Sequence, residues 1–529
     1  MAIWNPDATI PASIIKRRKN YQSFQAPEPA RDAARMAALK RLRHRLVSLC
    51  SKENKKAPVL AFERWISRVL LRQTSSNKSS DPIIPSDGKL DQGLIKDLSR
   101  TLSSQLAHSV AETMAADGLT AAHKVTSLSM NTIAEDAEGN IKDAAKAVRK
   151  AAKSAQACLA QNDNHNLEDT LAALKEATKE LEECTSKIQR DAGYGDLVKV
   201  DSSRRSGIYD VSLIGLDGNS KKPYLTISNH HLLKLLQLFT LNREQLDRKD
   251  GPVTSASFQN SKNQDPLKII QALGTHRTSF LNSMYCCLAR YEGLKGAGYQ
   301  CAVPGIAFDA AAEKCSLGTT IECFASPFNC RYANYCSAFP DIEHSYGSLG
   351  SFFDDSAFWP LEGSFEANPP FVPETMSMMG AKLDRLLRNK EANALSFLVI
   401  VPAWGAGIQF CQDLEASEFV RANTRVSAAD HAYCDGAQHN RVIRDNSVDL
   451  RPSSWDTAVI LLQNEFGASK WPVDTTKLEE SFCSAFRNAA KDIPPEAATI
   501  EKWERRGVGK GGRSTFATKD NNSNKRARR

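Results

Sequence analysis

Hydrophobic residues recur at steps of three and four through most of the first 200 residues, a spacing that predicts helices with one buried face. The clearest run begins after Pro29 and contains Met36, Leu39, Leu42, Leu46 and Leu49. A short helix is expected around residues 62–65, and longer ones across 92–190, the last with a heptad-like leucine stripe. We therefore expect an all-α helical domain over residues 28–200.

The pattern changes near residue 205, where the apolar runs become shorter. Two runs, 208–214 and 224–227, flank Asp217 and Gly218, a pair typical of hairpin turns. After residue 317, short apolar runs alternate with helical stretches, which favours a mainly parallel sheet. These runs are 319–324, 364–367, 395–401 and 457–462, with a helix expected over 374–388. The sequence thus predicts a hairpin and helical connection over 201–318 and an α/β domain over 319–490.

Charge adds a feature at each end of the chain. The net charge is +8, and residues 1–50 and 501–529 each carry ten basic and three acidic side chains. Because segments 1–27 and 491–529 also lack apolar periodicity, we expect both to be basic and disordered. Such ends suit contact with the phosphates of a polyanion, with solvated termini as the alternative interpretation.

Composition excludes several classes of protein. No apolar run approaches the ~18–20 residues of a membrane span, so no membrane association is expected. The thirteen cysteines include no CxxC pair, and the histidines show no ligand spacing, so neither a disulfide framework nor a metal site is indicated. Basic clusters at 16–19 and 525–529 resemble import signals and predict a nuclear location.

One segment of the α/β region carries candidate chemistry. A predicted strand leads directly into Asn368, Pro369, Pro370 and Phe371. The asparagine side chain and the following backbone carbonyl can accept both hydrogens of an exocyclic amine, which directs its lone pair toward an electrophilic methyl. The prolines stiffen the loop, and the phenylalanine can stack on a base. By itself the same segment also suits an ordinary turn at the end of a strand.

Two upstream segments favour the catalytic interpretation. Residues 319–329 predict a first strand ending in a tight turn, and ligands of doubly wound sheets bind outside such strand ends. Before it, residues 296–304 form a glycine-rich loop similar to one that, in a group of amino-methyltransferases, contacts the methionine end of S-adenosylmethionine.

Together these segments resemble the phosphorylated-CTD-interacting factor family of cap-specific adenosine-N6 methyltransferases. The likeness is carried by residues 321–346 and 364–371, and it continues through 395–404, 431–439 and 457–471. Residues 62–82 resemble the helical domain of the family more thinly. The resemblance implies a Rossmann-like class I S-adenosylmethionine-dependent methyltransferase domain preceded by an all-α domain.

The resemblance also implies a reaction and its residues. The methyl group would pass from S-adenosylmethionine to the exocyclic amine of the 2′-O-methyladenosine beside the 7-methylguanosine cap, on mRNA that begins with adenosine. The catalytic residues would be Asn368, Pro369, Pro370 and Phe371. The cofactor would be held by Gln300, Phe324, Ala325, Ser326, Pro327, Asn329 and Asp354. The cap would be bound by Pro402, Trp404 and Glu374.

The sequence departs from the family pattern at three places. Ala403 stands where an acidic residue is expected between Pro402 and Trp404, and Pro373 replaces another, which leaves Glu374 as the nearest acid. Trp4 has no second tryptophan nearby, so a WW domain and direct docking on the phosphorylated polymerase tail are not supported. Two alternatives stay open: a non-catalytic capped-RNA-binding protein of this fold, and an amino-methyltransferase acting on internal adenosine or a protein amide.

Overall fold

The computed structural model describes residues 27–73, 81, 83–85, 90–134, 139–161, 164–191, 198–213, 225–247, 265–295, 300–319, 321–404, 409–436, 439 and 450–490. The predictions of basic, disordered ends, of a turn at Asp217 and Gly218, and of a glycine-rich loop at 296–299 therefore lie outside the described residues, except for residue 27.

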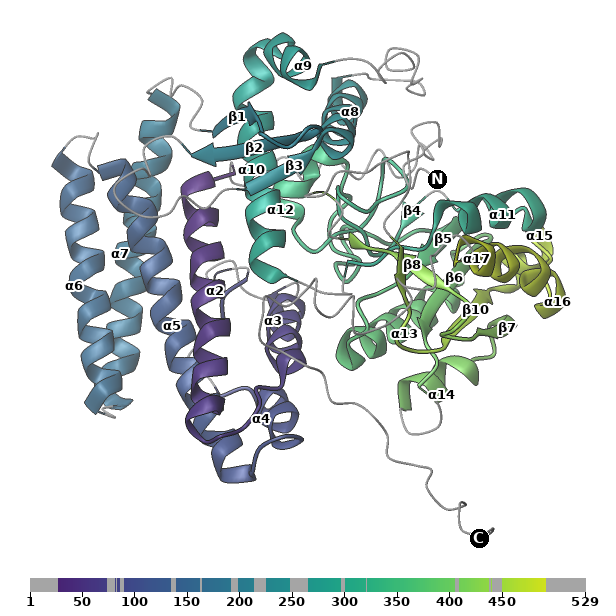
Figure 1. The fold of residues 1–529 in the computed structure, drawn as a ribbon, viewed down its shortest axis with the longest axis horizontal. Helices are drawn as coiled ribbons and strands as arrows, with labels where there is room; N and C mark the ends of the chain where they lie inside the picture. Colours follow the sequence, from purple (N-terminus) through teal and green to yellow (C-terminus); the bar gives the residue numbers. More distant parts are fainter. Residues whose placement is uncertain are drawn as a thin grey trace, which may run out of the picture.

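Long helices form the N-terminal part, as the apolar spacing predicts. In α2 (Pro29–Lys52) the side chains of Met36, Leu39, Leu42 and Leu46 are buried. The other helices are α3 (Val59–Gln73), α4 (Gln92–Ser99), α5 (Ser104–Ala134), α6 (Gly139–Gln161) and α7 (Asn164–Asp191). Figure 1 shows α2, α5, α6 and α7 side by side on the left of the molecule, where α2 packs against α5 and α6 against α7.

A small antiparallel sheet comes after the helices. The predicted hairpin is confirmed by β2 (Ile208–Leu213) and β3 (Leu225–Ser228), and β1 (Val198–Ser202) adds a third strand that the sequence did not indicate. The next helices are α8 (Asn229–Asp247), α9 (Pro266–Ala272), the 3₁₀ turn η4 (Gly274–His276) and α10 (Arg277–Leu294). Because α10 packs on α2 and also on this sheet, it joins the helical part to the small sheet.

The second sheet has the order β4–β5–β6–β10–β7. The strands β4 (Ile321–Glu322), β5 (Gly363–Ala367) and β6 (Leu395–Pro402) pair in parallel, as expected. Strand β10 (Thr457–Gln463) lies antiparallel between β6 and β7 (Val420–Val426). The sheet is therefore mixed: β4 to β7 share one direction and β10 opposes them. This corrects the expectation of mainly parallel pairing, and antiparallel pairing needs no crossover helix.

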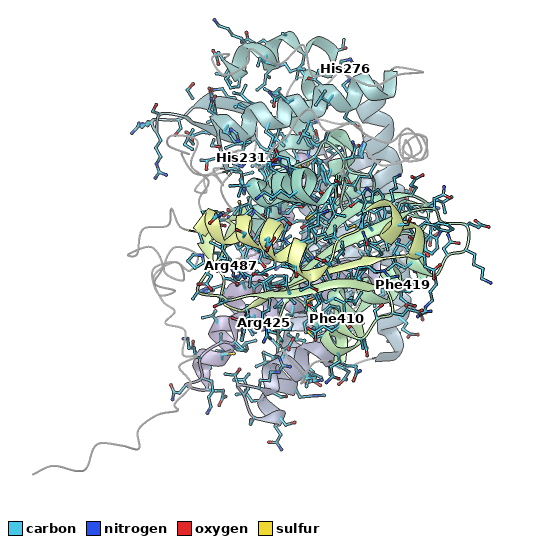
Figure 2. All side chains as sticks on the ribbon, turned by 90° about the vertical axis from the view of Figure 1, so that its right-hand side faces the viewer. His231, His276, Phe410, Phe419, Arg425 and Arg487 are labelled. Atoms are coloured by element: carbon cyan, nitrogen blue, oxygen red, sulfur yellow. The ribbon has the colours of Figure 1, made fainter. Side chains whose placement is uncertain are left out.

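Alternating side chains of this sheet face two separate cores. Phe397, Val399 and Val401 of β6 pack with the helices α13 (Pro373–Leu387) and α14 (Gln409–Glu415), whereas Leu398 and Ile400 face α11 (Gly305–Cys315) and α17 (Ser484–Ala490). Figure 2 shows Phe410, on α14, below the strands and Arg487, on α17, above them. Helices thus cover both faces, so a ligand must approach the sheet at a strand end or an edge.

Short elements complete the described chain. They are α12 (Pro340–Glu343), the 3₁₀ turn η5 (His344–Tyr346), the two-stranded sheet of β8 (Ala432–Cys434) and β9 (Leu450–Pro452), α15 (Glu465–Lys470), α16 (Thr475–Leu478) and the π-helical turn η7 (Glu479–Cys483). None of the helices in the described ranges is long and apolar enough to cross a membrane.

Candidate active site at the ends of β4 and β5

A cavity lies where β4 and β5 end, and its empty space is about 1150 Å³. One wall comes from the sheet domain, and its lining residues follow β4, follow β5 or belong to the segment before α11. This wall includes Gln300, Cys301, Cys323, Phe324, Ala325, Ser326, Asn329, Asn368 and Pro370. The structure therefore brings together segments that the sequence predicted separately.

Two of the seven predicted cofactor residues do not line this cavity. Pro327 is buried within the turn after β4. The carboxylate of Asp354 accepts hydrogen bonds from the backbone N–H and the hydroxyl of Ser356, at 2.9 and 2.6 Å, and so stabilises its own turn. The other five, Gln300, Phe324, Ala325, Ser326 and Asn329, are all in the lining.

Asn329 fixes the turn after β4 to the segment before α11. Its Oδ1 accepts the backbone N–H and the hydroxyl of Ser326 at 2.7 and 2.8 Å, and its Nδ2 donates to the Gln300 carbonyl at 3.0 Å. Behind this carbonyl stands Gly436, where an added Cβ would lie 2.0 Å from the same oxygen. Only glycine permits this approach, so the polar end of the cavity is built from three segments held rigidly together.

Asn368 follows β5, and its amide is oriented by the segment before α11. Its Nδ2 donates to the Cys301 carbonyl at 3.3 Å, which directs Oδ1 of the planar amide away from that carbonyl. No described residue donates a hydrogen bond to Oδ1 of Asn368 or to the carbonyl of Pro369. Two acceptor oxygens on adjacent residues are therefore available to a ligand with a planar amine.

Phe371 is supported from behind by an aromatic and hydroxyl network. Its ring meets Tyr433 edge-on, with 6.0 Å between the centroids. The Tyr433 hydroxyl and Nε2 of His431 both lie within hydrogen-bond distance of the Thr457 hydroxyl, at 2.7 and 2.8 Å. The buried His431 thus contributes to the support of the loop.

Two buried carboxyl groups lie on the strands that lead into the site. Glu322 accepts the backbone N–H groups of Arg331 and Tyr332 at 2.7 and 3.2 Å, which holds the segment after β4. Burial raises the pKa of Glu322 to about 7, and burial together with the nearby Glu322 raises the pKa of Glu366 well above its usual range. Burial at this position therefore favours the protonated form of Glu366 over its charged form.

The helical part supplies a second wall that the sequence did not predict. Its lining residues are Phe62, Glu63, Ile66, Ser67, Leu70 and Leu71 of α3, and Tyr291 and Leu294 of α10. Glu63 is only 9% exposed although it carries a carboxylate, and burial raises its pKa, with Arg43 acting in the opposite direction. An acidic residue beside the apolar stripe of Phe62, Ile66 and Leu70 was the one sequence signal for this wall.

The three predicted cap residues fall in two places. Pro402 and Trp404 are at the end of β6, and the Trp404 ring meets Trp455 edge-on at 6.2 Å, with Trp455 55% exposed. Glu374 is in the first turn of α13, where its Oε1 lies 3.4 Å from Nη1 of Arg68 on α3. The structure therefore gives Glu374 a contact with the helical part.

No group of three or more His, Cys, Asp or Glu side chains that could hold a metal ion occurs among the residues described.

Comparison with known proteins identifies the same part of the chain. Residues 269–436 match the family described as "Phosphorylated CTD interacting factor 1 WW domain", a segment that contains every site residue that the sequence predicted. The human "mRNA (2'-O-methyladenosine-N(6)-)-methyltransferase" is 37% identical over 219 residues, which cover 40% of this chain and 30% of that protein. The mouse protein of the same description is 38% identical over 208 residues, covering 38% of this chain and 28% of that protein. The aligned region thus spans about 30% of the length of these curated relatives.

Proposed function

We propose that this chain is a member of the phosphorylated CTD interacting factor family and that it acts as an mRNA cap-specific adenosine-N6 methyltransferase, because residues 269–436 match that family and the aligned relatives carry this description. The reaction would transfer a methyl group to the exocyclic amine of the 2′-O-methyladenosine beside the cap, on RNA that begins with adenosine. The observation that carries this proposal is the amide of Asn368, anchored through Nδ2 to Cys301 and lining the cavity with its oxygen unpartnered among the described residues.

The Asn368 loop would position the adenine amine. Its two N–H groups would be accepted by Oδ1 of Asn368 and the carbonyl of Pro369, which localises the nitrogen lone pair for attack. Bound S-adenosylmethionine would supply the methyl group: the new N–C bond would form as the C–S bond breaks with its electron pair going to sulfur, and the amine proton would leave to water. Phe371, braced by Tyr433, would stack on the adenine face.

The cavity suits S-adenosylmethionine, which when bound supplies an electrophilic methyl on a sulfonium. Phe324, Phe352 and Phe353 form an aromatic cluster with centroids 4.9 to 5.7 Å apart, suited to a flat adenine. Gln300, Asn329 and the unpartnered Oε2 of Glu63 form a polar region suited to the amino-acid end. The single reversed strand β10 beside parallel β4 to β6 also supports the class I methyltransferase fold.

Cap binding would take place on the surface around Trp404. A flat, cationic 7-methylguanine would stack on this ring, an arrangement that combines stacking with a cation–π attraction. Pro402 stiffens the strand end, and Glu374 is the candidate acid for the edge of the guanine. The exposed Trp455 beside Trp404 supports an aromatic ligand surface here.

The remaining parts of the proposal rest on the sequence. The basic ends would contact RNA phosphates without reading bases, and the basic clusters at 16–19 and 525–529 would direct the protein to the nucleus. Direct docking on the phosphorylated polymerase tail is not part of the proposal.

The test is methyl transfer from labelled S-adenosylmethionine to three acceptors: capped adenosine-starting RNA, the same RNA uncapped, and a glutamine-containing peptide. We expect transfer to the capped RNA, and Asn368→Ala should lower it by roughly 10²–10³-fold, since one preorganised polar group at the reacting centre is lost. Preferential transfer to the uncapped RNA would instead indicate internal adenosine as the acceptor, and preferential transfer to the peptide would indicate a protein amide. Binding of capped RNA without any transfer would favour a non-catalytic capped-RNA-binding protein.

A further inference from the structure

A buried carboxylate on the helical wall has one oxygen without a partner. Oε1 of Glu63 lies 3.3 Å from Nε of Arg43, whereas Oε2 is buried and has no hydrogen-bond partner among the described residues. The side chain is 9% exposed and lines the cavity. Leaving such an oxygen unpaired costs roughly 1–3 kcal/mol or more, so its retention beside a cavity points to a ligand donor.

Arg43 cannot turn to satisfy this oxygen, because its guanidinium is already engaged. Nη1 and Nη2 donate to the carbonyl of Gly293 at 3.3 Å, Nη2 donates to the carbonyl of Leu294 at 2.8 Å, and the guanidinium carbon lies 4.8 Å above the ring of Phe62. One carboxylate oxygen is therefore committed to Arg43, and the other, on a residue that lines the cavity, has no partner among the described residues.

The surroundings favour a cationic donor over a neutral hydroxyl. Gly293 and Leu294 are the last residues of α10, an 18-residue helix, and its C-terminal carbonyls carry partial negative charge. In its ionised form, Glu63 adds a negative charge at the same place. Arg43 already lies in this field, and a second small cation within reach of Oε2 would be stabilised by the same two sources.

We propose that Glu63 binds the α-ammonium group of the S-adenosylmethionine amino-acid end through Oε2. The inference rests on the proposed function and names a ligand contact supplied by the helical part rather than by the sheet. Its place in the cavity agrees with the chemistry: Leu294 and Gln300 flank the glycine-rich segment that the sequence links to the methionine end.

The experiment pairs a variant with a modified ligand. Calorimetry on the full chain measures binding of S-adenosylhomocysteine and of its deamino analogue, in which hydrogen replaces the α-amino group. The wild type should bind S-adenosylhomocysteine at least about tenfold more tightly than the analogue, as expected for a charge-assisted hydrogen bond. Glu63→Gln, which keeps the size and an acceptor for Arg43, should bind the two ligands within about threefold of each other.

Ser67→Ala is the matched control, because Ser67 lines the same face of α3 one turn on and its hydroxyl already donates to the Glu63 carbonyl at 2.9 Å. It should keep the tenfold discrimination. If Glu63→Gln does not fold, Glu63→Asp is measured in its place. This variant should retain part of the preference for S-adenosylhomocysteine over the deamino analogue.

Two results would overturn the role of Glu63 and leave the proposed function intact. In the first, the wild type binds the two ligands with equal affinity. In the second, Glu63→Gln lowers the affinity for both ligands by the same factor. The second would assign the contact to a ribose hydroxyl. A wild type that binds neither ligand would refute the proposed function itself, so the two failures are distinguishable.

Discussion

The two walls of the cavity are built in different ways. The sheet wall presents short amides, hydroxyls and backbone carbonyls that are cross-linked by Asn329 and Asn368. The helical wall is mostly apolar and carries one buried carboxylate, Glu63. The difference teaches that the group that would orient the reacting amine and the group that would hold the charged end of the cofactor come from different parts of the chain. Their alignment therefore depends on the joints between the walls.

Arg290 of α10 is a buried contact that joins the two walls. It bonds Asp32 of α2 at 2.9 Å and forms a two-pronged contact with Asp341 of α12, at 2.8 and 2.7 Å. Asp32 also pairs with Arg35 at 2.9 Å, and the pKa of Asp32 is lowered to about 2 because these two arginines outweigh the effect of burial. The helical part and the segment after β4 are thus held through one guanidinium.

The largest expected effect comes from Arg290→Leu. Without Arg290, the buried carboxylate of Asp32 keeps only Arg35 to balance its negative charge. We therefore expect the free energy of unfolding to fall by about 3–5 kcal/mol, measured by denaturant titration. The matched control is Arg45→Leu on α2, whose pair with Asp117 is 45% and 36% exposed and should contribute less than about 1 kcal/mol. Equal effects of the two variants would contradict the view that the walls are held at this point.

A second joint makes stability depend on pH. Glu343 of α12 is fully buried and accepts the hydroxyl of Tyr291 of α10 at 2.7 Å, and burial raises its pKa to about 7 from the ordinary 4.5. Between pH 4.5 and 7 the carboxyl group of Glu343 is protonated in the folded state and ionised in the unfolded state. The contribution of Glu343 to the free energy of unfolding therefore decreases as pH rises from 4.5 to 7, and it is constant below and above this range.

Glu343→Gln should flatten this dependence by up to about 3 kcal/mol between pH 4.5 and 7.5, because the amide does not titrate. Unfolding free energies of the two proteins at several pH values across this window measure the difference. Glu391→Gln at an exposed position is the control and should leave the wild-type dependence unchanged. If Glu343→Gln behaves like this control, the carboxyl is ionised in the folded protein at neutral pH.

The sheet wall could be anticipated from sequence, whereas the helical wall could not. Asn368 and Ser326 come soon after short apolar strands, and parallel strands place such residues at one edge of a sheet. The contacts that hold the helical wall in place join residues remote in sequence: Arg43 contacts Gly293 across 250 residues, and Arg290 contacts Asp32 across 258. No local periodicity encodes such pairs.

Particular misses have local causes. Strands β8 and β9 have three residues each, too few for an alternating pattern to be recognised. Asp354, predicted from the sequence as a cofactor residue, also stabilises a turn through Ser356, two residues on. Sequence alone does not separate these two uses of one carboxylate.

A smaller effect is expected at Trp404, which belongs to the sheet domain alone. Trp404→Ala should lower the preference for capped over uncapped RNA by about 1–3 kcal/mol, the contribution of a stacked base, and leave S-adenosylhomocysteine binding unchanged. The comparison variant lacks residues 505–529 and should weaken binding of both RNAs. It should also flatten the salt slope by ~0.7 for each phosphate that the tail neutralises on single-stranded RNA. A tail deletion that erases cap preference while Trp404→Ala preserves it would move the cap site away from Trp404.

The smallest effect is expected at the rim, where Glu374 of α13 meets Arg68 of α3 at 3.4 Å. Glu374 is 45% exposed, and Arg68 keeps Asp91 and Asp97 at 3.2 and 2.9 Å, so Glu374→Gln should change the free energy of unfolding by less than about 1 kcal/mol. The same variant should weaken binding of capped RNA if Glu374 contacts the guanine edge. Thermal unfolding and capped-RNA titration of one preparation therefore distinguish a joint between the walls from a substrate contact, since a joint would alter stability and a contact would alter only the titration.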